Sequence, residues 1–166
     1  MIPAIRPETA SDARAIHALT KRAFAPMPFA GGDEQDVIDR LRAAGALSLS
    51  LVAETDGVLS GHLALSPAAH ESGAGGWYAL GPISVEPGVQ RAGIGAALIA
   101  AAKAWLAGEG ARGCILTGNP RYYERFGFAP APAHTPQGEP EAYFQIWILN
   151  GPVPAGRFRF HPAFYG

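Results

Sequence analysis

The part of this sequence that most restricts its fold is a single stretch, residues 77–107. Residues 77–85 form a long, mostly apolar run that predicts a strand. Gly81 and Pro82 interrupt its middle, and because proline cannot donate to a strand ladder, we expect a bulge there. A glycine-rich turn follows over residues 86–95, and apolar residues then recur at helical spacing to about Ala107. The stretch therefore predicts a strand, a turn and a helix in direct succession.

The end of this turn, Gly93-Ile94-Gly95, has the chemistry of a phosphate site. The first four N–H groups of a helix have no internal partners and carry partial positive charge. Glycines remove the side chains that would keep a ligand away from these groups, and Arg91 can add a charge-assisted contact. The turn is therefore a candidate diphosphate site. The alternative is that the glycines only allow close packing of helix against strand.

Two other phosphate-binding loops do not fit the same residues. The dinucleotide fingerprint needs a third small residue where Leu98 stands, and an acidic residue about 20 positions on, where residues 114–118 offer none. The Walker loop needs a lysine beside its last glycine, but Lys21 and Lys103 both lie elsewhere.

The remaining elements predict a mixed α/β sheet flanked by helices. Asp56-Gly57 is a two-residue turn signal between two alternating runs, so we expect a hairpin there. Asn119-Pro120 is typical of a helix start, and Gly127 of its end. The other predicted elements are strands at 2–5, 48–54, 58–65, 113–117 and 143–149, helices at 9–24 and 33–44, and an irregular loop at 129–141. With no repeat and no boundary visible, we expect a single domain over residues 1–166.

Composition narrows the class of protein. Hydrophobic residues make up 48% of the chain and charged residues 16%, so a core can form. Lys+Arg at 13 against Asp+Glu at 14 argues against nucleic-acid binding. No apolar run reaches the roughly 18 residues of a membrane span, and no secretory signal is visible, so we expect a cytoplasmic protein. Cys114, the single cysteine, is expected to be a buried, inert thiol.

Three motifs together resemble the GNAT family of N-acetyltransferases. The first is Gln90-Arg91-Ala92-Gly93-Ile94-Gly95, which matches the family signature Q/R-x-x-G-x-G/A after the fourth strand. The second is the segment from Tyr122 to Phe128, YYERFGF, which is similar to F-Y-x-x-x-G-F. The third is the opening Ile5-Arg6-Pro7 with Asp12. The forms LGPISVEPG, GNPRYYERFGF and FRFHPAF resemble the bacterial YhbS-like branch, so the likeness covers nearly the whole chain.

The resemblance implies an acyl-CoA N-acyltransferase fold, with a predominantly antiparallel sheet that splays between its fourth and fifth strands. In the family the pantetheine arm of acetyl-CoA lies in that gap and pairs with the strand edge. This assigns the backbone of Ile83, Ser84 and Val85 to the pantetheine and the thioester. The diphosphate falls to the backbone of Gln90, Arg91, Ala92, Gly93, Ile94, Gly95 and Ala96. Asn119 is a further candidate contact to the pantetheine, besides capping its helix.

Tyr123 matches the family tyrosine that protonates the departing thiolate, and its neighbour Tyr122 is the alternative. A phenol is a plausible acid toward a thiolate. The general base stays open, because residues 77–85 contain neither an acid nor a histidine. Four side chains elsewhere are candidates, and a water chain would also serve: His62, His70, His134 and Glu141.

The resemblance implies an enzyme that transfers acetyl from acetyl-CoA directly to an amine of a small molecule or peptide, without a metal. We expect the acceptor pocket around residues 24–32 and 129–143, and a monomer or homodimer. Two alternatives remain open, a catalytically silent acyl-CoA-binding regulatory or sensor module and an interaction domain without a cofactor.

Overall fold

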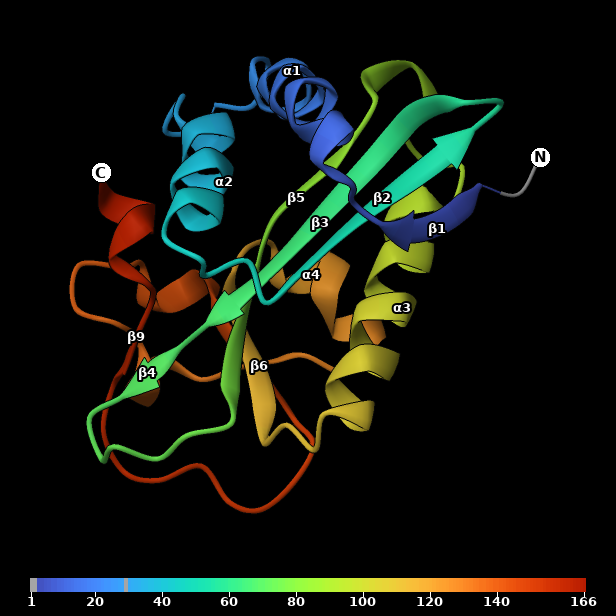
Figure 1. Ribbon diagram of the computed structural model, residues 1–166. Coiled ribbons are helices and arrows are strands. Elements are labelled where there is room, and N and C mark those ends of the chain that lie inside the picture. The colour runs from blue at the N-terminus through green and yellow to red at the C-terminus, as the bar shows by residue number, and fades with distance from the viewer. Residues whose placement is uncertain (1–2, 29) are drawn as a thin grey trace.

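The computed structural model describes residues 3–28 and 30–166 and is built around one long twisted sheet (Figure 1). Seven strands form the sheet in the order β1-β2-β3-β5-β6-β8-β7. Their bounds are Ala4–Pro7 (β1), Leu49–Thr55 (β2), Val58–Pro67 (β3), Trp77–Val85 (β5), Gly113–Thr117 (β6), Ala129–Pro130 (β7) and Phe144–Ile148 (β8). All neighbours are antiparallel except β5 and β6, which run parallel. The mixed, mostly antiparallel sheet expected for the GNAT fold is confirmed.

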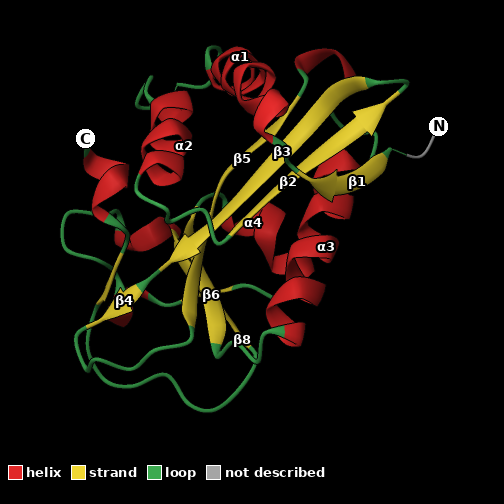
Figure 2. Cartoon of the chain, viewed as in Figure 1, coloured by secondary structure: helices red, strands yellow, loops and turns green. Residues whose placement is uncertain are grey.

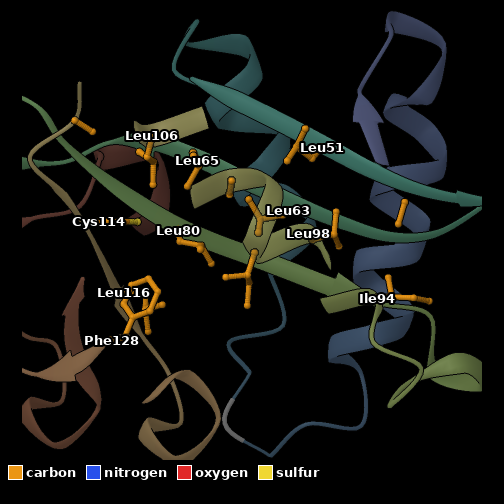
Figure 3. Packing of buried hydrophobic residues seen from close by; sticks show 14 residues of the cluster. Leu51, Leu63, Leu65, Leu80, Ile94, Leu98, Leu106, Cys114, Leu116 and Phe128 are labelled. Atoms are coloured by element: carbon orange, nitrogen blue, oxygen red, sulfur yellow. The ribbon is translucent and has the colours of Figure 1, made fainter. Parts of the chain in front are cut away.

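Helices cover both faces of this sheet (Figure 2). They are α1 (Ala13–Phe24), α2 (Glu34–Ala43), α3 (Ile94–Gly108) and α4 (Pro120–Tyr123), with α1 preceded by a 3-10 turn at Ala10–Asp12. On the α3 face, leucines of β2, β3 and β5 meet Leu98 and Leu106 in the largest apolar cluster (Figure 3). On the other face, α1 and α2 meet β2 through Ile16, Ile38 and Val52. Burial on both faces explains why β3 and β5 are so apolar.

The predicted hairpin is confirmed, and its turn shows why the sequence signals it. Asp56 and Gly57 both adopt positive φ, at 52° and 79°. This is the geometry that joins two antiparallel strands with matching twist, and Asp-Gly tolerates it. The predicted bulge is also present, because Leu63 pairs with Ile83 and Leu65 pairs with Leu80, which leaves one extra residue on β5.

Three short strands were not predicted from the sequence. β7 lies inside the stretch expected to be an irregular loop and pairs with β8. β4 (Ala69–His70) pairs with β9 (Phe158–Arg159) in a separate two-stranded sheet. Each has two residues, too few for a period to be visible in the sequence. At the N-terminus, the strand predicted at 2–5 is found at Ala4–Pro7, and Ile2 lies outside the described residues.

Candidate active site

The sheet opens between β5 and β6. The two strands pair at only three positions, ending at Ala79 with Ile115. Beyond that point the described chain has no pair between them, although β5 continues to Val85 and β6 to Thr117. Ile83, Ser84 and Val85 therefore pair with β3 on one side and present a free edge on the other. Such an edge can add an extended, amide-bearing ligand as a further strand.

The free edge leads directly to the predicted diphosphate turn. Residues 87–93 are exposed, and α3 begins at Ile94 with Gly93 as its N-cap. The first intrahelical bond runs from the Ala97 N–H to the Gly93 carbonyl, so the N–H groups of residues 94–96 precede the ladder. Neither acidic nor basic side chains occupy this first turn. The segment assigned to the diphosphate thus ends in backbone N–H groups that have no acceptor within the helix.

Gly93 and Gly95 have different roles in this corner. Gly93 has a φ of 83° and open space where a side chain would begin, so it shapes the turn. At Gly95, a Cβ would lie 2.6 Å from the Tyr122 hydroxyl oxygen, so the glycine makes room for that phenol. Gly95 therefore allows the close approach of α4, whereas Gly93 supplies the left-handed backbone that the turn requires.

The side chains around the turn are partly engaged. Gln90 Nε2 donates to the Val85 carbonyl at 3.3 Å, which ties the turn to the end of β5. Arg91 is exposed, with a φ of 72°. Glu86 pairs with Arg22 of α1 at 2.8 Å and so points away from the turn. The Asn119 side-chain oxygen accepts from the Arg121 N–H at 3.0 Å, which is the predicted cap.

Tyr122 and Tyr123 lie perpendicular to one another, with ring centroids 4.9 Å apart. The Tyr122 hydroxyl lies against Gly95 and near Val85, at the end of the free edge that leads to α3. The Tyr123 ring lies on Gly118 and near Leu116, beside the divergent part of β6. Burial raises the pKa of Tyr123 well above its ordinary value, with Tyr122 and Cys114 adding to the shift, so the group is a neutral phenol at physiological pH.

The four candidate bases lie in different surroundings. His70 and His134 both contact the Gly156 carbonyl, in the corner held by the β4–β9 pair. Glu141 is exposed in a 3-10 turn before β8. His62 lies on β3, directly opposite Ser84 of the free strand, and is fully buried. Of the four, only His62 belongs to the same strand pair as the expected thioester site.

Cys114 is fully buried, and burial raises its pKa far above the ordinary value. The thiol is therefore not a nucleophile at neutral pH, as the sequence predicted.

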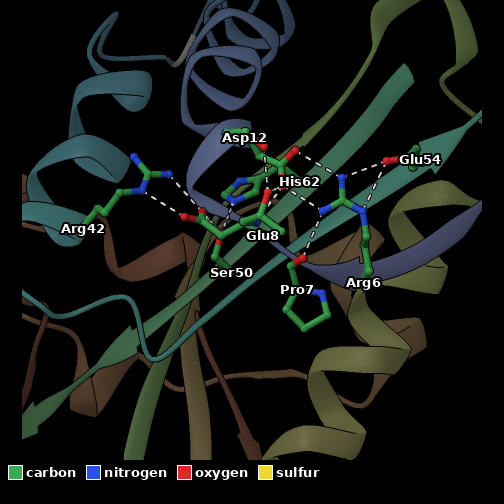
Figure 4. Close-up of polar contacts among 10 residues, drawn as sticks. Arg6, Pro7, Glu8, Asp12, Arg42, Ser50, Glu54 and His62 are labelled. Atoms are coloured by element: carbon green, nitrogen blue, oxygen red, sulfur yellow. Dashed lines mark hydrogen bonds and ion pairs between the residues drawn. The ribbon is translucent and has the colours of Figure 1, made fainter. Parts of the chain in front are cut away.

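Two polar groups at the site were not found from the sequence. Glu139 accepts hydrogen bonds from Thr117 at the end of β6 and from the Tyr165 hydroxyl, at 3.2 and 3.0 Å. Ser50 of β2 bridges Glu8 and His62, which lies on the neighbouring strand β3 (Figure 4). Both assemblies join segments far apart in the chain, so no local pattern could have revealed them.

In the described part of the chain, every helix is too short or too polar to cross a membrane. A family model described as the acetyltransferase (GNAT) family matches residues 14–128. No curated protein sequence matches the chain significantly.

Solved structures give close matches over the full length. A GNAT family acetyltransferase from Brucella melitensis, in complex with acetyl-CoA, is 44% identical, with a TM-score of 0.87 over 98% of this chain and 97% of that one. The GNAT family N-acetyltransferase YhbS from Escherichia coli, in complex with CoA, is 28% identical, with a TM-score of 0.86 over 100% and 94%. The PaiA N-acetyltransferase from Thermoplasma acidophilum shares the fold, at 16% identity and a TM-score of 0.67 over 90% and 100%.

The divergent strand pair, the open helix N-terminus beside it, the family model and the full-length structural matches agree: this chain belongs to the GNAT acetyltransferase family.

Proposed function

We propose that the protein is an N-acetyltransferase that moves an acetyl group from acetyl-CoA to an amine of a small molecule or peptide. The observation that carries the proposal is the free edge of β5, which leads into an open helix N-terminus and faces two tyrosines. The Brucella and Escherichia coli structures, which hold acetyl-CoA and CoA, support the choice of cosubstrate. We also propose that residues 1–166 act as one catalytic domain.

The chain's own groups divide the work of binding. The backbone of Ile83, Ser84 and Val85 pairs with the pantetheine amides, because this edge has no partner strand in the described chain. The backbone N–H groups of residues 90–96 bind the diphosphate, whose charge is favoured at the start of α3. Arg91, exposed at the turn, adds a positive charge.

The transfer itself is a direct attack. The amine nitrogen forms a bond to the thioester carbon, the carbon–sulfur bond breaks, and the departing thiolate takes a proton from a phenol. No acyl-enzyme is needed, and Cys114 is too deeply buried to form one.

The position of the two phenols favours Tyr123 as the proton donor. Acetyl-CoA bound as proposed has its diphosphate at the start of α3 and its thioester further along the gap. Tyr122 lies at the diphosphate end, against Gly95. Tyr123 lies further along, with its ring against Gly118 and near Leu116 of β6. Tyr123 is therefore the phenol nearer to the sulfur.

An amine acceptor also fits the negative charge of Glu139, which lies next to the end of β6. Thr117 follows Ile115 on the sheet face away from α3, and Glu139 accepts its hydrogen bond there. A carboxylate beside the open end of β6 attracts an ammonium group before transfer. Of the predicted acceptor segments, 129–143 includes Glu139, and 24–32 includes Phe29, which lies outside the described residues.

Steady-state thiol release from acetyl-CoA, measured with a panel of primary amines, tests this function. Tyr123→Phe should lower kcat by about a hundredfold or more, because general-acid catalysis is typically worth that much, and should leave the affinity for acetyl-CoA nearly unchanged. Tyr122→Phe is the matched variant and should lower kcat far less. Tight binding of acetyl-CoA without thiol release for any amine would instead support the silent acyl-CoA-binding module.

A further inference from the structure

A chain of hydrogen bonds runs from the surface to His62 of β3, the strand next to β5 (Figure 4). Arg42 of α2 holds Glu8 through two contacts, at 2.9 and 3.0 Å. The Ser50 hydroxyl donates to the Glu8 carboxylate, and the same oxygen lies 2.7 Å from His62 Nε2. Glu8, Ser50 and His62 come from three separate segments, and we call this set the Glu8–Ser50–His62 chain.

The hydrogen bonds fix the tautomer of His62. Burial opposes ionisation of Glu8, but hydrogen bonds from Arg42 and Ser50 outweigh it and hold the Glu8 pKa below its ordinary value. The ionised carboxylate can only accept, so the single proton of Ser50 is directed to it. The Ser50 oxygen must then accept from His62, which places the imidazole proton on Nε2. The Nδ1 atom is left with a free lone pair.

That lone pair has no hydrogen-bond partner within residues 3–28 and 30–166, although the ring is fully buried. The Ser84 hydroxyl, 2% exposed, lacks a partner among the same residues. His62 and Ser84 are direct cross-strand partners in β3 and β5, so their Cβ atoms are about 5 Å apart on the same face of the sheet. Buried polar groups are nearly always paired, so two orphans side by side indicate a polar role.

Among the described residues, the side chains that α1 and α2 bury are all uncharged. The buried positions of α1 are Ile16, Leu19, Thr20 and Ala23, and those of α2 are Gln35, Val37, Ile38 and Leu41. Glu8 and Arg42 are the charged groups that act on His62, with opposite effects.

The far end of the chain reaches solvent. Glu8, Arg42 and Ser50 line a surface hollow of about 390 Å³ beside the end of β1. A proton that arrives at Glu8 can therefore leave to water without passing through the core.

We propose that Ser84, His62, Ser50 and Glu8 form the proton path that deprotonates the attacking amine. Before the attack, the ammonium form of the amine passes one proton to the Ser84 oxygen, whose own proton moves to His62 Nδ1. His62 Nε2 gives its proton to Ser50, and the Ser50 proton moves to Glu8, which releases it to the hollow. The free amine then attacks, Tyr123 gives its proton to the departing thiolate, and the second proton lost by the nitrogen restores the Tyr123 phenol. The products are therefore the acetylated amine, the free thiol and one proton released at Glu8. Ser84 contacts the amine, and the other three act through it.

This inference rests on the proposed function and supplies the base that β5 itself does not contain. It is tested with Ser84→Ala, which keeps the main chain that binds pantetheine, and with Glu8→Gln, which keeps an acceptor for Ser50 but cannot take a proton. The matched control is Ser60→Ala, because Ser60 is a buried serine of the neighbouring strand β3 whose hydroxyl contacts only the Ala53 carbonyl and Thr55. Thermal denaturation and acetyl-CoA affinity establish that each variant is folded.

With the best amine of the panel, Ser84→Ala and Glu8→Gln should each lower kcat about a hundredfold at pH 7 and leave the KM for acetyl-CoA unchanged. The defect should shrink at least about tenfold by pH 9.5, because an alkylamine with a pKa near 10 then supplies its own free base. Ser60→Ala should match the wild type at both pH values. A purely structural role would give a defect that does not depend on pH.

The outcomes separate this path from the function on which it rests. The proton path alone is overturned if the wild type is active and Ser84→Ala either turns over at the wild-type rate or shows the same defect at both pH values. A wild type that binds acetyl-CoA and acetylates no amine overturns both. Nitrogen NMR of labelled His62 gives an independent check, since a proton on Nδ1 rather than Nε2 also overturns the path.

Discussion

The position of Tyr123 depends on the absence of a side chain at Gly118, and this dependence can be tested with one methyl group. In Gly118→Ala the new Cβ would lie 2.6 Å from Tyr123 Cε2 and 3.2 Å from Cδ2. Carbon atoms in contact normally stand about 3.5–4.0 Å apart, so the ring must retreat by about 1 Å. Gly118 has no positive φ, so alanine fits its backbone and the steric effect is isolated.

A displacement of that size at a reacting group costs on the order of a hundredfold in rate. We therefore expect Gly118→Ala to lower kcat by about a hundredfold, with little change in the affinity for acetyl-CoA. Steady-state thiol release gives kcat, and calorimetric titration gives the affinity. Gly108→Ala is the control, because a Cβ at this helical glycine meets open space. It should retain wild-type kcat and be equally stable or more stable by up to about 1 kcal/mol.

The reasoning fails if Gly118→Ala turns over at the wild-type rate while its crystal structure shows the Tyr123 ring displaced. That result would mean that the phenol need not stand where the wild-type chain holds it. A large fall in thermal stability would instead identify a packing defect, which is why both variants are compared by denaturation.

Three further predictions concern binding and stability. Gly95→Glu should weaken acetyl-CoA binding at least about tenfold by calorimetry, because it displaces Tyr122 and adds a negative charge where the diphosphate is proposed to bind. Unchanged affinity would refute the assigned site. Asp12→Asn should lower the free energy of unfolding by about 1–3 kcal/mol in urea titrations at pH 7, because the Asp12 carboxylate accepts from Arg6 at 2.7 Å and from a backbone N–H. Those contacts hold the Asp12 pKa well below its ordinary value, so the difference from wild type should persist at pH 5 and vanish only in strong acid. Burial lowers the pKa of His62 to about 4 from 6.5, so as the pH falls the unfolded chain binds a proton at this histidine before the folded chain does. The free energy of unfolding should therefore fall by about 3 kcal/mol between pH 6.5 and pH 4, measured by urea titration. His62→Gln should lose that part of the pH dependence.

Much of the fold was predictable because its signals are local. β5 has the predicted bounds, Trp77–Val85, and α3 ends within one residue of its predicted end. Both follow from hydrophobic periodicity and from turn residues that act on their immediate neighbours. The turn at residues 56–57 is also locally determined, because Asp and Gly both tolerate the positive φ that this turn requires. The glycine turn before α3, where we propose that the diphosphate binds, was predictable for the same reason, because a helix start beside a glycine turn is a local structure.

What remained hidden depends on contacts between distant segments. The point at which β5 and β6 part, after Ala79 and Ile115, is set by packing on two faces of the sheet and by a bulge opposite β3. The partner of Gly95 proved to be Tyr122, from an element formed more than twenty residues later. His62 was one of four equal candidates until the fold brought it to Ser50 and Ser84. A one-dimensional pattern predicts which residues can pair, but only the folded sheet decides which of them meet.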